Sequence, residues 1–199
     1  MITLPPDPVA AASWLIRCIT AIAPTEYGDV RWRDVPDIRP AAVLIPIVWH
    51  ADVPTIVLTQ RTHALREHAG QVSFAGGKLE EGERDPIAAA LREAEEEIAL
   101  ESARVQVLGC LPPYTTRTCY RVTPVVGLLV PPLKLMAHPG EVADIFELPL
   151  SWALDPAHYQ QHDYHSEGRT GSYLSLDWGP YHVWGATAAI LWLFAQALR

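Results

Sequence analysis

The spacing of hydrophobic residues predicts helices near both ends of the chain. Residues 10–21 place Trp14, Leu15 and Ile19 at helical intervals. Residues 186–198 form the most apolar stretch, but a bilayer-spanning helix needs about 20 such residues. We therefore expect the C-terminal stretch to be a helix that packs on the core of a globular protein.

Runs rich in β-branched and aromatic residues predict the strands between these helices. The first two, residues 41–49 and 55–61, are separated by a short segment and indicate a hairpin. Further strands are expected at residues 72–74, 105–111, 121–130, 142–147, 173–177 and 181–183, and the last two form a second hairpin. Strands and helices do not alternate regularly, which favours an α/β (α+β) fold with helices packed on the faces of a mixed sheet. The histidine-containing segment 158–165 is polar and is expected to be a loop.

A third helix begins where Asp85 can cap it and Pro86 takes its first position. The helix carries Glu93, Glu96 and Glu97. At about 100° per residue these three carboxylates share one arc, and the apolar residues form a separate stripe. The helix can therefore bury one side and present three carboxylates along the neighbouring edge.

This clustering of like charges destabilises an isolated helix. Glu93 and Glu97 repel each other at i,i+4 spacing by roughly 0.2–0.5 kcal/mol, and anions near a helix C-terminus cost about 0.3–1 kcal/mol each. A bound cation would offset both costs, and carboxylate oxygens suit Mg²⁺ or Mn²⁺. Gly76 and Gly77 upstream allow a tight backbone turn toward such an ion. The alternative is a solvated acidic face.

Composition narrows the functional classes. The net charge of −8 argues against broad nucleic-acid binding, which needs clustered basic residues. The 3 cysteines are an odd number without metal-ligand spacing and indicate reduced thiols. The start of the chain lacks the basic segment of a signal peptide. We expect a cytoplasmic protein without a membrane partner, consisting of a helical extension and connector at residues 1–40 and one domain at residues 41–199.

The segment from residue 77 to residue 100 resembles the Nudix box, G-x5-E-x7-R-E-U-x-E-E-x-G-U, where U is aliphatic. The matching positions are Gly77, Glu83, Arg92, Glu93, Ala94, Glu96, Glu97 and Leu100. Two positions depart from the pattern. Eight residues instead of seven separate Glu83 from Arg92, and Ala99 replaces the final glycine. The extra residue is a feature of one branch of the superfamily, the coenzyme A pyrophosphatases.

Residues 58–62 and 65–77 are similar to the signature that precedes the box in the coenzyme A branch. Ala75 stands where that branch usually has proline. Further similarity follows at residues 111–113, 120–127, 147–150 and 183–188, so the resemblance covers most of the chain. It implies a Nudix-type α/β/α sandwich. It also implies cleavage of coenzyme A or its thioesters to adenosine 3′,5′-bisphosphate and (acyl-)4′-phosphopantetheine.

The resemblance also implies roles for individual residues. Mg²⁺ or Mn²⁺ would be held by Glu93, Glu96 and Glu97, and Arg92 would fix a neighbouring carboxylate. Glu83 is expected to anchor the loop. The general base stays open among Glu93, Glu96 and Glu141.

The coenzyme A substrate, a small nucleotide, carries a 3′-phosphate that calls for a basic group. The residues expected to bind the substrate are Arg61, Arg66, His68, Gln71 and Gly77. Homodimers occur in the family, so a homodimer is compatible with the resemblance. Two other functions fit the same sequence. One is Nudix hydrolysis of an ADP-sugar, a dinucleotide or a nucleoside triphosphate, and the other is a nucleotide-sensing module without catalysis.

Overall fold

The computed structural model describes residues 2–23, 27–65, 67–166 and 169–199. The helices are α1 (Pro8–Thr20), α2 (Pro86–Ile98), α3 (Leu150–Leu154) and α4 (Gly185–Ala197), with short 3₁₀ turns at η1 (Trp32–Asp34), η2 (Ser102–Arg104) and η3 (Pro156–His158). The strands are β1 (Tyr27–Gly28), β2 (Arg39–Val48), β3 (Thr55–Arg61), β4 (Val72–Ser73), β5 (Gly76–Lys78), β6 (Gln106–Cys110), β7 (Tyr114–Thr115), β8 (Tyr120–Leu129), β9 (Val142–Pro149), β10 (Gln160–Ser166), β11 (Arg169–Trp178) and β12 (Tyr181–Trp184).

The main sheet is built around β2 and is mixed. β2 pairs in parallel with β8 along its whole length. On its other side β2 pairs antiparallel with β3 near one end and with β5 near the other. β9 and β4 continue the sheet beyond β3, and β6 and β7 lie beside β8. The predicted mixed sheet and the predicted β2–β3 hairpin are confirmed.

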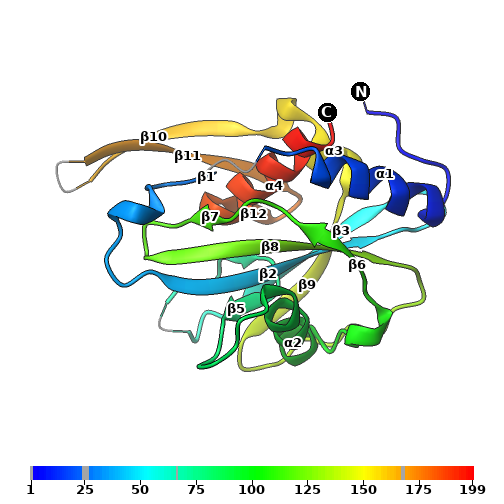
Figure 1. Cartoon of the computed structure of the whole chain (residues 1–199), viewed down its shortest axis with the longest axis horizontal. Coiled ribbons are helices and arrows are strands. Elements are labelled where there is room, and N and C mark those ends of the chain that lie inside the picture. Colours follow the sequence, from blue (N-terminus) through cyan, green and yellow to red (C-terminus); the bar gives the residue numbers. More distant parts are fainter. Residues whose placement is uncertain (1, 24–26, 66, 167–168) are drawn as a thin grey trace.

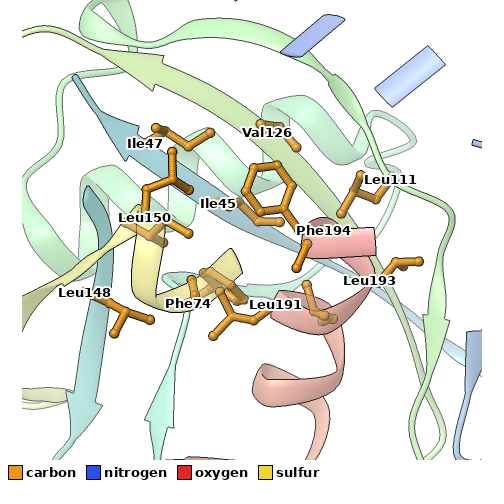
Figure 2. Packing of buried hydrophobic residues seen from close by; sticks show 14 of the residues in the cluster. Ile45, Ile47, Phe74, Leu111, Val126, Leu148, Leu150, Leu191, Leu193 and Phe194 are labelled. Carbon is orange, nitrogen blue, oxygen red and sulfur yellow. The ribbon is translucent and has the colours of Figure 1, made fainter. Parts of the chain in front are cut away.

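Helices cover both faces of this sheet, as expected for an α/β/α sandwich. Figure 1 shows α2 on one side of the sheet and α1, α3 and α4 on the other. Side chains alternate between two apolar clusters because strand residues point to opposite faces in turn. On β2, Ala42 and Leu44 pack with α2, whereas Ala41 and Ile45 join the larger cluster under α1, α3 and α4. In that larger cluster, Figure 2 shows Phe194 of α4 beside Ile45 and Leu191 of α4 beside Phe74.

A second sheet is formed by β10, β11 and β12, and its longest hairpin extends away from the main sheet (Figure 1). The predicted hairpin of β11 and β12 is confirmed. The predicted loop at residues 158–165 is wrong, because residues 160–166 form β10 and pair with β11. β10 is mostly exposed to solvent, so it lacks the apolar alternation by which a strand is recognised in a sequence.

The N-terminal helix packs on the same core as the main sheet. Asp7 caps α1 by accepting hydrogen bonds from the amides of Val9 and Ala10. Leu15 of α1 is fully buried in the larger cluster. The connector contributes β1, which pairs in parallel with β7. The division of the chain at residue 40 stays a prediction. In the described part of the chain, no helix is long and apolar enough to cross a membrane.

Candidate active site

The α2 helix is placed by its cap and by small apolar residues. The carboxylate of Asp85 accepts a hydrogen bond from the Ile87 amide, and Pro86 begins the helix as predicted. Ala90 and Ala94 are buried against the sheet, so the helix backbone lies close to β2 and β5. As a result, the glutamates near the end of α2 face the Gly76–Lys78 strand.

Glu97 is the most enclosed of these glutamates, with 3% of its surface exposed. Its Oε2 accepts a hydrogen bond from the Gly76 amide at 3.3 Å, and its Oε1 lies 3.7 Å from the Arg61 guanidinium. Burial raises the pKa of Glu97 to about 7, and the charges of Glu93 and Glu141 act in the same direction. Arg61 and the Gly76 amide oppose this rise. The carboxyl group is therefore only partly ionised near neutral pH without a cation.

Glu93 occupies space that only a glycine at residue 77 leaves open. A β-carbon added at Gly77 would lie 2.5 Å from the carboxyl carbon of Glu93, well inside van der Waals contact. Burial raises the pKa of Glu93, and the charges of Glu96 and Glu141 add to this effect. Gly77 thus makes room for a carboxylate at the start of the site.

Arg92 links the carboxylates of α2 to the preceding loop. Its guanidinium lies 2.9 Å from Glu93, 3.2 Å from Glu96 and 3.3 Å from Glu83. It also donates a hydrogen bond to the Lys78 carbonyl at 3.3 Å. Glu83 in turn accepts a hydrogen bond from the Glu80 amide, and this bond lowers the pKa of Glu83. Arg92 therefore holds the loop, the strand and the helix in one arrangement.

Glu141 lies beside the end of β3, next to the strand residue Arg61 that contacts Glu97. It immediately precedes β9, and its carbonyl accepts a hydrogen bond from the Thr62 amide just after β3. Glu141 is exposed, and its charge affects the pKa of both Glu93 and Glu97. Residue 141 therefore lies close enough to α2 for its charge to act on the carboxylates of Glu93 and Glu97.

The residues expected to bind substrate lie in different surroundings. Arg61 points toward Glu97, and its amide donates a hydrogen bond to the Gln71 carbonyl. His68 and Gln71 contact each other through Nδ1 and Oε1 at 2.9 Å. His68 is exposed and Gln71 is partly buried. Arg66 lies outside the described residues.

The oxygen donors suit a hard divalent cation, but they are not arranged around one. Among the described residues, no group of three His, Cys, Asp or Glu side chains converges as a ready-made metal site. The reason is that Arg92 pairs with Glu93 and Glu96, while Gly76 and Arg61 contact Glu97. Crowded carboxylates with raised pKa values are nevertheless the chemistry that a divalent cation stabilises.

A shallow hollow of about 350 Å³ lies on the outer side of α2. It is lined by Ala88, Leu91, Arg92, Glu95, Glu96 and Ser102. Glu95 accepts a hydrogen bond from Ser102 there and takes no part in the pairing around Arg92. The hollow therefore borders the carboxylate cluster on its solvent side.

Two contacts of this site were not predicted from the sequence. The first is the pairing of Arg61 with Glu97, which joins residues 36 positions apart (97 minus 61). The second is the space that Gly77 leaves for Glu93, since the glycine had been assigned to substrate binding. The only sequence signal for the second contact was the glycine pair itself.

The chain is similar to a known protein family and to individual relatives within it. A model of the NUDIX domain matches residues 38–167, which include every glutamate of the cluster. The protein named "Uncharacterized Nudix hydrolase NudL" from Escherichia coli K12 is 45% identical over 159 residues, covering 80% of this chain and 82% of that protein. The protein of the same name from Shigella boydii serotype 18 gives the same values.

Solved structures also show similarity. An Ap4A hydrolase binary complex from Caenorhabditis elegans has a TM-score of 0.49 and 20% identity, covering 56% of this chain and 80% of that one. The NUDIX domain of Shewanella oneidensis NrtR complexed with ADP ribose has a TM-score of 0.45 and 14% identity, covering 62% and 80%. The domain match over residues 38–167, together with 45% identity to NudL, shows that this chain belongs to the Nudix hydrolase family.

Proposed function

We propose that this Nudix hydrolase cleaves the pyrophosphate bond of coenzyme A or its thioesters, using a divalent metal ion. The observation that carries the proposal is the placement of Glu93 and Glu97 against the Gly76–Lys78 strand, with Glu96 joined to Glu93 through Arg92 and the charge of Glu141 acting on both Glu93 and Glu97. Nudix hydrolases act on nucleotide derivatives and generally use such ions. The products would be adenosine 3′,5′-bisphosphate and (acyl-)4′-phosphopantetheine.

Glu93, Glu96 and Glu97 are the residues we propose to hold Mg²⁺ or Mn²⁺. When bound, the ion supplies charge neutralisation for the phosphates and acidifies a bound water. The crowding that raises the pKa of Glu93 and Glu97 supports this assignment, since a nearby cation would favour the ionised carboxylates.

Arg92 is proposed to position these carboxylates. It pairs with Glu83 in the loop between β5 and α2 and with Glu93 and Glu96 on α2, so it ties the helix to the loop. A guanidinium suits this task because its fork donates several hydrogen bonds in one plane. Loss of the fork would leave the acidic side chains to repel one another.

The proton of the attacking water needs an acceptor. Glu141 is our first candidate, because it is exposed and adjacent to the cluster, whereas Glu96 is paired with Arg92. In the reaction, the water oxygen bonds to one phosphorus, and the bond from that phosphorus to the bridging oxygen breaks. The bridging oxygen leaves on the other phosphate, and the carboxylate takes the proton of the water.

The coenzyme A assignment is supported by the signature at residues 58–62 and 65–77. Within it, Arg61, Arg66, His68 and Gln71 are proposed to contact the substrate. The Arg61 amide at the end of β3 donates a hydrogen bond to the Gln71 carbonyl, and the Arg61 guanidinium lies 3.7 Å from Glu97. Gln71 is therefore held near the carboxylates through Arg61. A homodimer stays a prediction from the resemblance.

Product analysis tests the proposal. Incubation of the protein with coenzyme A and Mg²⁺ or Mn²⁺, followed by phosphorus NMR or chromatography, should show adenosine 3′,5′-bisphosphate. EDTA should abolish the reaction, and Glu97→Gln should slow it by roughly a hundredfold or more, because a metal ligand is lost. Glu95→Gln is the matched control, since Glu95 lies on the same helix but faces Ser102.

Turnover of ADP-ribose or a dinucleotide with no cleavage of coenzyme A would reject the substrate and retain the metal site. An absence of turnover with every pyrophosphate would favour a nucleotide-sensing protein.

A further inference from the structure

We infer that Arg39, Lys78 and Tyr120 form a binding site for a second phosphate of the substrate, a phosphomonoester that is not cleaved. The inference rests on the proposed function, because it assigns the part of the substrate beyond the pyrophosphate. It adds three residues that the sequence did not single out. They come from three strands, β2, β5 and β8.

The three side chains meet around one aromatic ring. The guanidinium carbon of Arg39 lies 4.0 Å from the centroid of the Tyr120 ring, and the Lys78 ammonium nitrogen lies 5.9 Å from it. Both distances fall within the range of cation–π attraction, which extends to about 6 Å. Arg39 is also fixed by a hydrogen bond to the Thr118 carbonyl at 2.7 Å. Both cations therefore lie within about 6 Å of the centroid of the same ring.

Arg39 and Lys78 share this ring in a chain whose net charge is −8. In the part of the chain that the structure describes, neither Arg39 nor Lys78 forms an ion pair with an acidic side chain. Arg61 and Arg92, by contrast, are engaged by glutamates. Mutual repulsion disfavours two adjacent positive charges unless an anion accompanies them. A phosphate dianion would supply that charge.

Lys78 lies one residue along β5 from the carboxylate cluster. Lys78 follows Gly77, which faces Glu93, and the Lys78 carbonyl accepts a hydrogen bond from Arg92. Successive strand residues point to opposite faces of a sheet, so the Lys78 side chain leaves on the face away from α2. The register agrees, because Lys78 pairs with Ala41, which packs in the cluster on that face.

A ligand can connect the two faces across β5. β2 is the one strand partner of β5 within the described chain, so the other edge of β5 is not covered by a strand. A reacting pyrophosphate beside Gly77 and a second phosphate beside Lys78 would therefore lie on either side of a single strand. In adenosine 3′,5′-bisphosphate one ribose separates the two phosphate groups. The geometry thus points to a nucleotide with a 3′-phosphate next to its 5′-diphosphate.

This site also resolves a gap in the substrate assignment. A 3′-phosphate needs a cation that is not already neutralised, but Arg61 contacts Glu97. Lys78 and Arg39 meet that need, and Lys78 directly follows Gly77 in β5. They would therefore determine preference for coenzyme A over its 3′-dephospho form.

Binding of the product tests the site without turnover. Isothermal titration with adenosine 3′,5′-bisphosphate and with AMP gives the ratio of the two affinities. We expect the wild-type protein to favour the bisphosphate by roughly tenfold or more, because each charge-assisted contact is worth that much. Arg39→Gln and Lys78→Gln should each reduce the ratio toward one. Lys134→Gln, the same change at the other lysine of the chain, should leave it unchanged.

Tyr120 provides a second test that removes no charge. Tyr120→Phe keeps the ring and should keep the ratio, whereas Tyr120→Leu should lower it, because the cations lose their common support. Thermal unfolding of each variant verifies that it is folded. An unchanged ratio in folded Arg39→Gln and Lys78→Gln proteins would overturn the inference.

Kinetics separate this inference from the proposed function. In the same variants, KM for coenzyme A should rise about tenfold, and KM for 3′-dephospho-coenzyme A should not change. If coenzyme A is cleaved but both variants keep the wild-type ratio of KM values, the phosphate site is rejected and the function stands. If no form cleaves coenzyme A, the function is rejected, and the binding ratio still decides the site.

Discussion

At the scale of single residues, the site depends on how far each carboxylate is removed from water. Glu97 is buried, Glu93 is partly buried and Glu96 is exposed, although all three share one arc of α2. Burial without a full set of hydrogen bonds penalises the charged form. The order of enclosure therefore explains why Glu97 has the pKa that is raised to about 7.

This pKa predicts a pH dependence of stability in the metal-free protein. The ordinary pKa of a glutamate is 4.5, so between that value and about 7 the folded chain keeps a proton that the unfolded chain has lost. The free energy of unfolding should therefore fall as the pH rises through this window, by on the order of 1–3 kcal/mol. Urea unfolding in EDTA at pH 5 and pH 8 measures the change.

In Glu97→Gln the free energy of unfolding should fall less between pH 5 and pH 8, and Glu95→Gln should behave like the wild type. Equal falls in the wild-type and Glu97→Gln proteins would show that Glu97 does not titrate in this range.

The residues of the cluster differ in how far they could be predicted. Glu93, Glu96 and Glu97 follow from helical spacing alone, because one helix carries them all. The contact of Arg61 with Glu97 depends on how β3 and α2 pack, and the spacing of residues contains no information about that distance. Arg61 was therefore expected to bind the substrate, whereas in the structure its guanidinium contacts the carboxylate of Glu97.

At the scale of elements, the end of α2 shows how the helix accommodates the missing glycine. Ala99 adopts the left-handed conformation with φ 53° and ψ 32°. Its backbone N–H donates hydrogen bonds to the carbonyls of Ala94 and Glu95. The Leu100 amide also donates a hydrogen bond to the Ala94 carbonyl. The helix thus ends as a glycine would end it, with an L-residue in a region that costs roughly 1–2 kcal/mol.

Ala99→Gly should therefore stabilise the protein by about 0.5–1 kcal/mol, after the greater flexibility of glycine in the unfolded chain is subtracted. Ala88→Gly in the exposed first turn of the same helix should destabilise it by about 0.5–1 kcal/mol. Chemical unfolding of both variants provides the comparison. A destabilising Ala99→Gly would mean that the left-handed conformation is not strained.

Elements with strong local signals were predictable, and those formed by distant pairing were not. The α2 helix is specified by Asp85, Pro86 and its apolar stripe, all within the helix or next to it. β10 is polar and exposed, and β1 and β7 have 2 residues each. These strands exist because a distant partner satisfies their backbone groups, so their own residues carry little evidence of them.

At the scale of the whole molecule, the main sheet carries acidic side chains on one face and basic side chains on the other. The acidic cluster lies on the α2 face, and Arg39, Lys78 and Tyr120 lie on the other face, with β5 between them. Tyr120 meets Arg39 because β2 and β8 pair in parallel, although 81 positions (120 minus 39) separate the two residues. The acidic half was visible in the sequence, whereas the basic half required the fold.

Manganese binding, measured by titration calorimetry at neutral pH, tests most directly whether the α2 carboxylates form a metal site. The wild-type protein should bind Mn²⁺ and release protons, because Glu97 must lose its proton to become a ligand. Glu97→Gln should weaken binding by roughly tenfold or more, and Glu95→Gln should bind as the wild type does. Equal Mn²⁺ affinity in all three proteins would contradict the account and place the ion elsewhere.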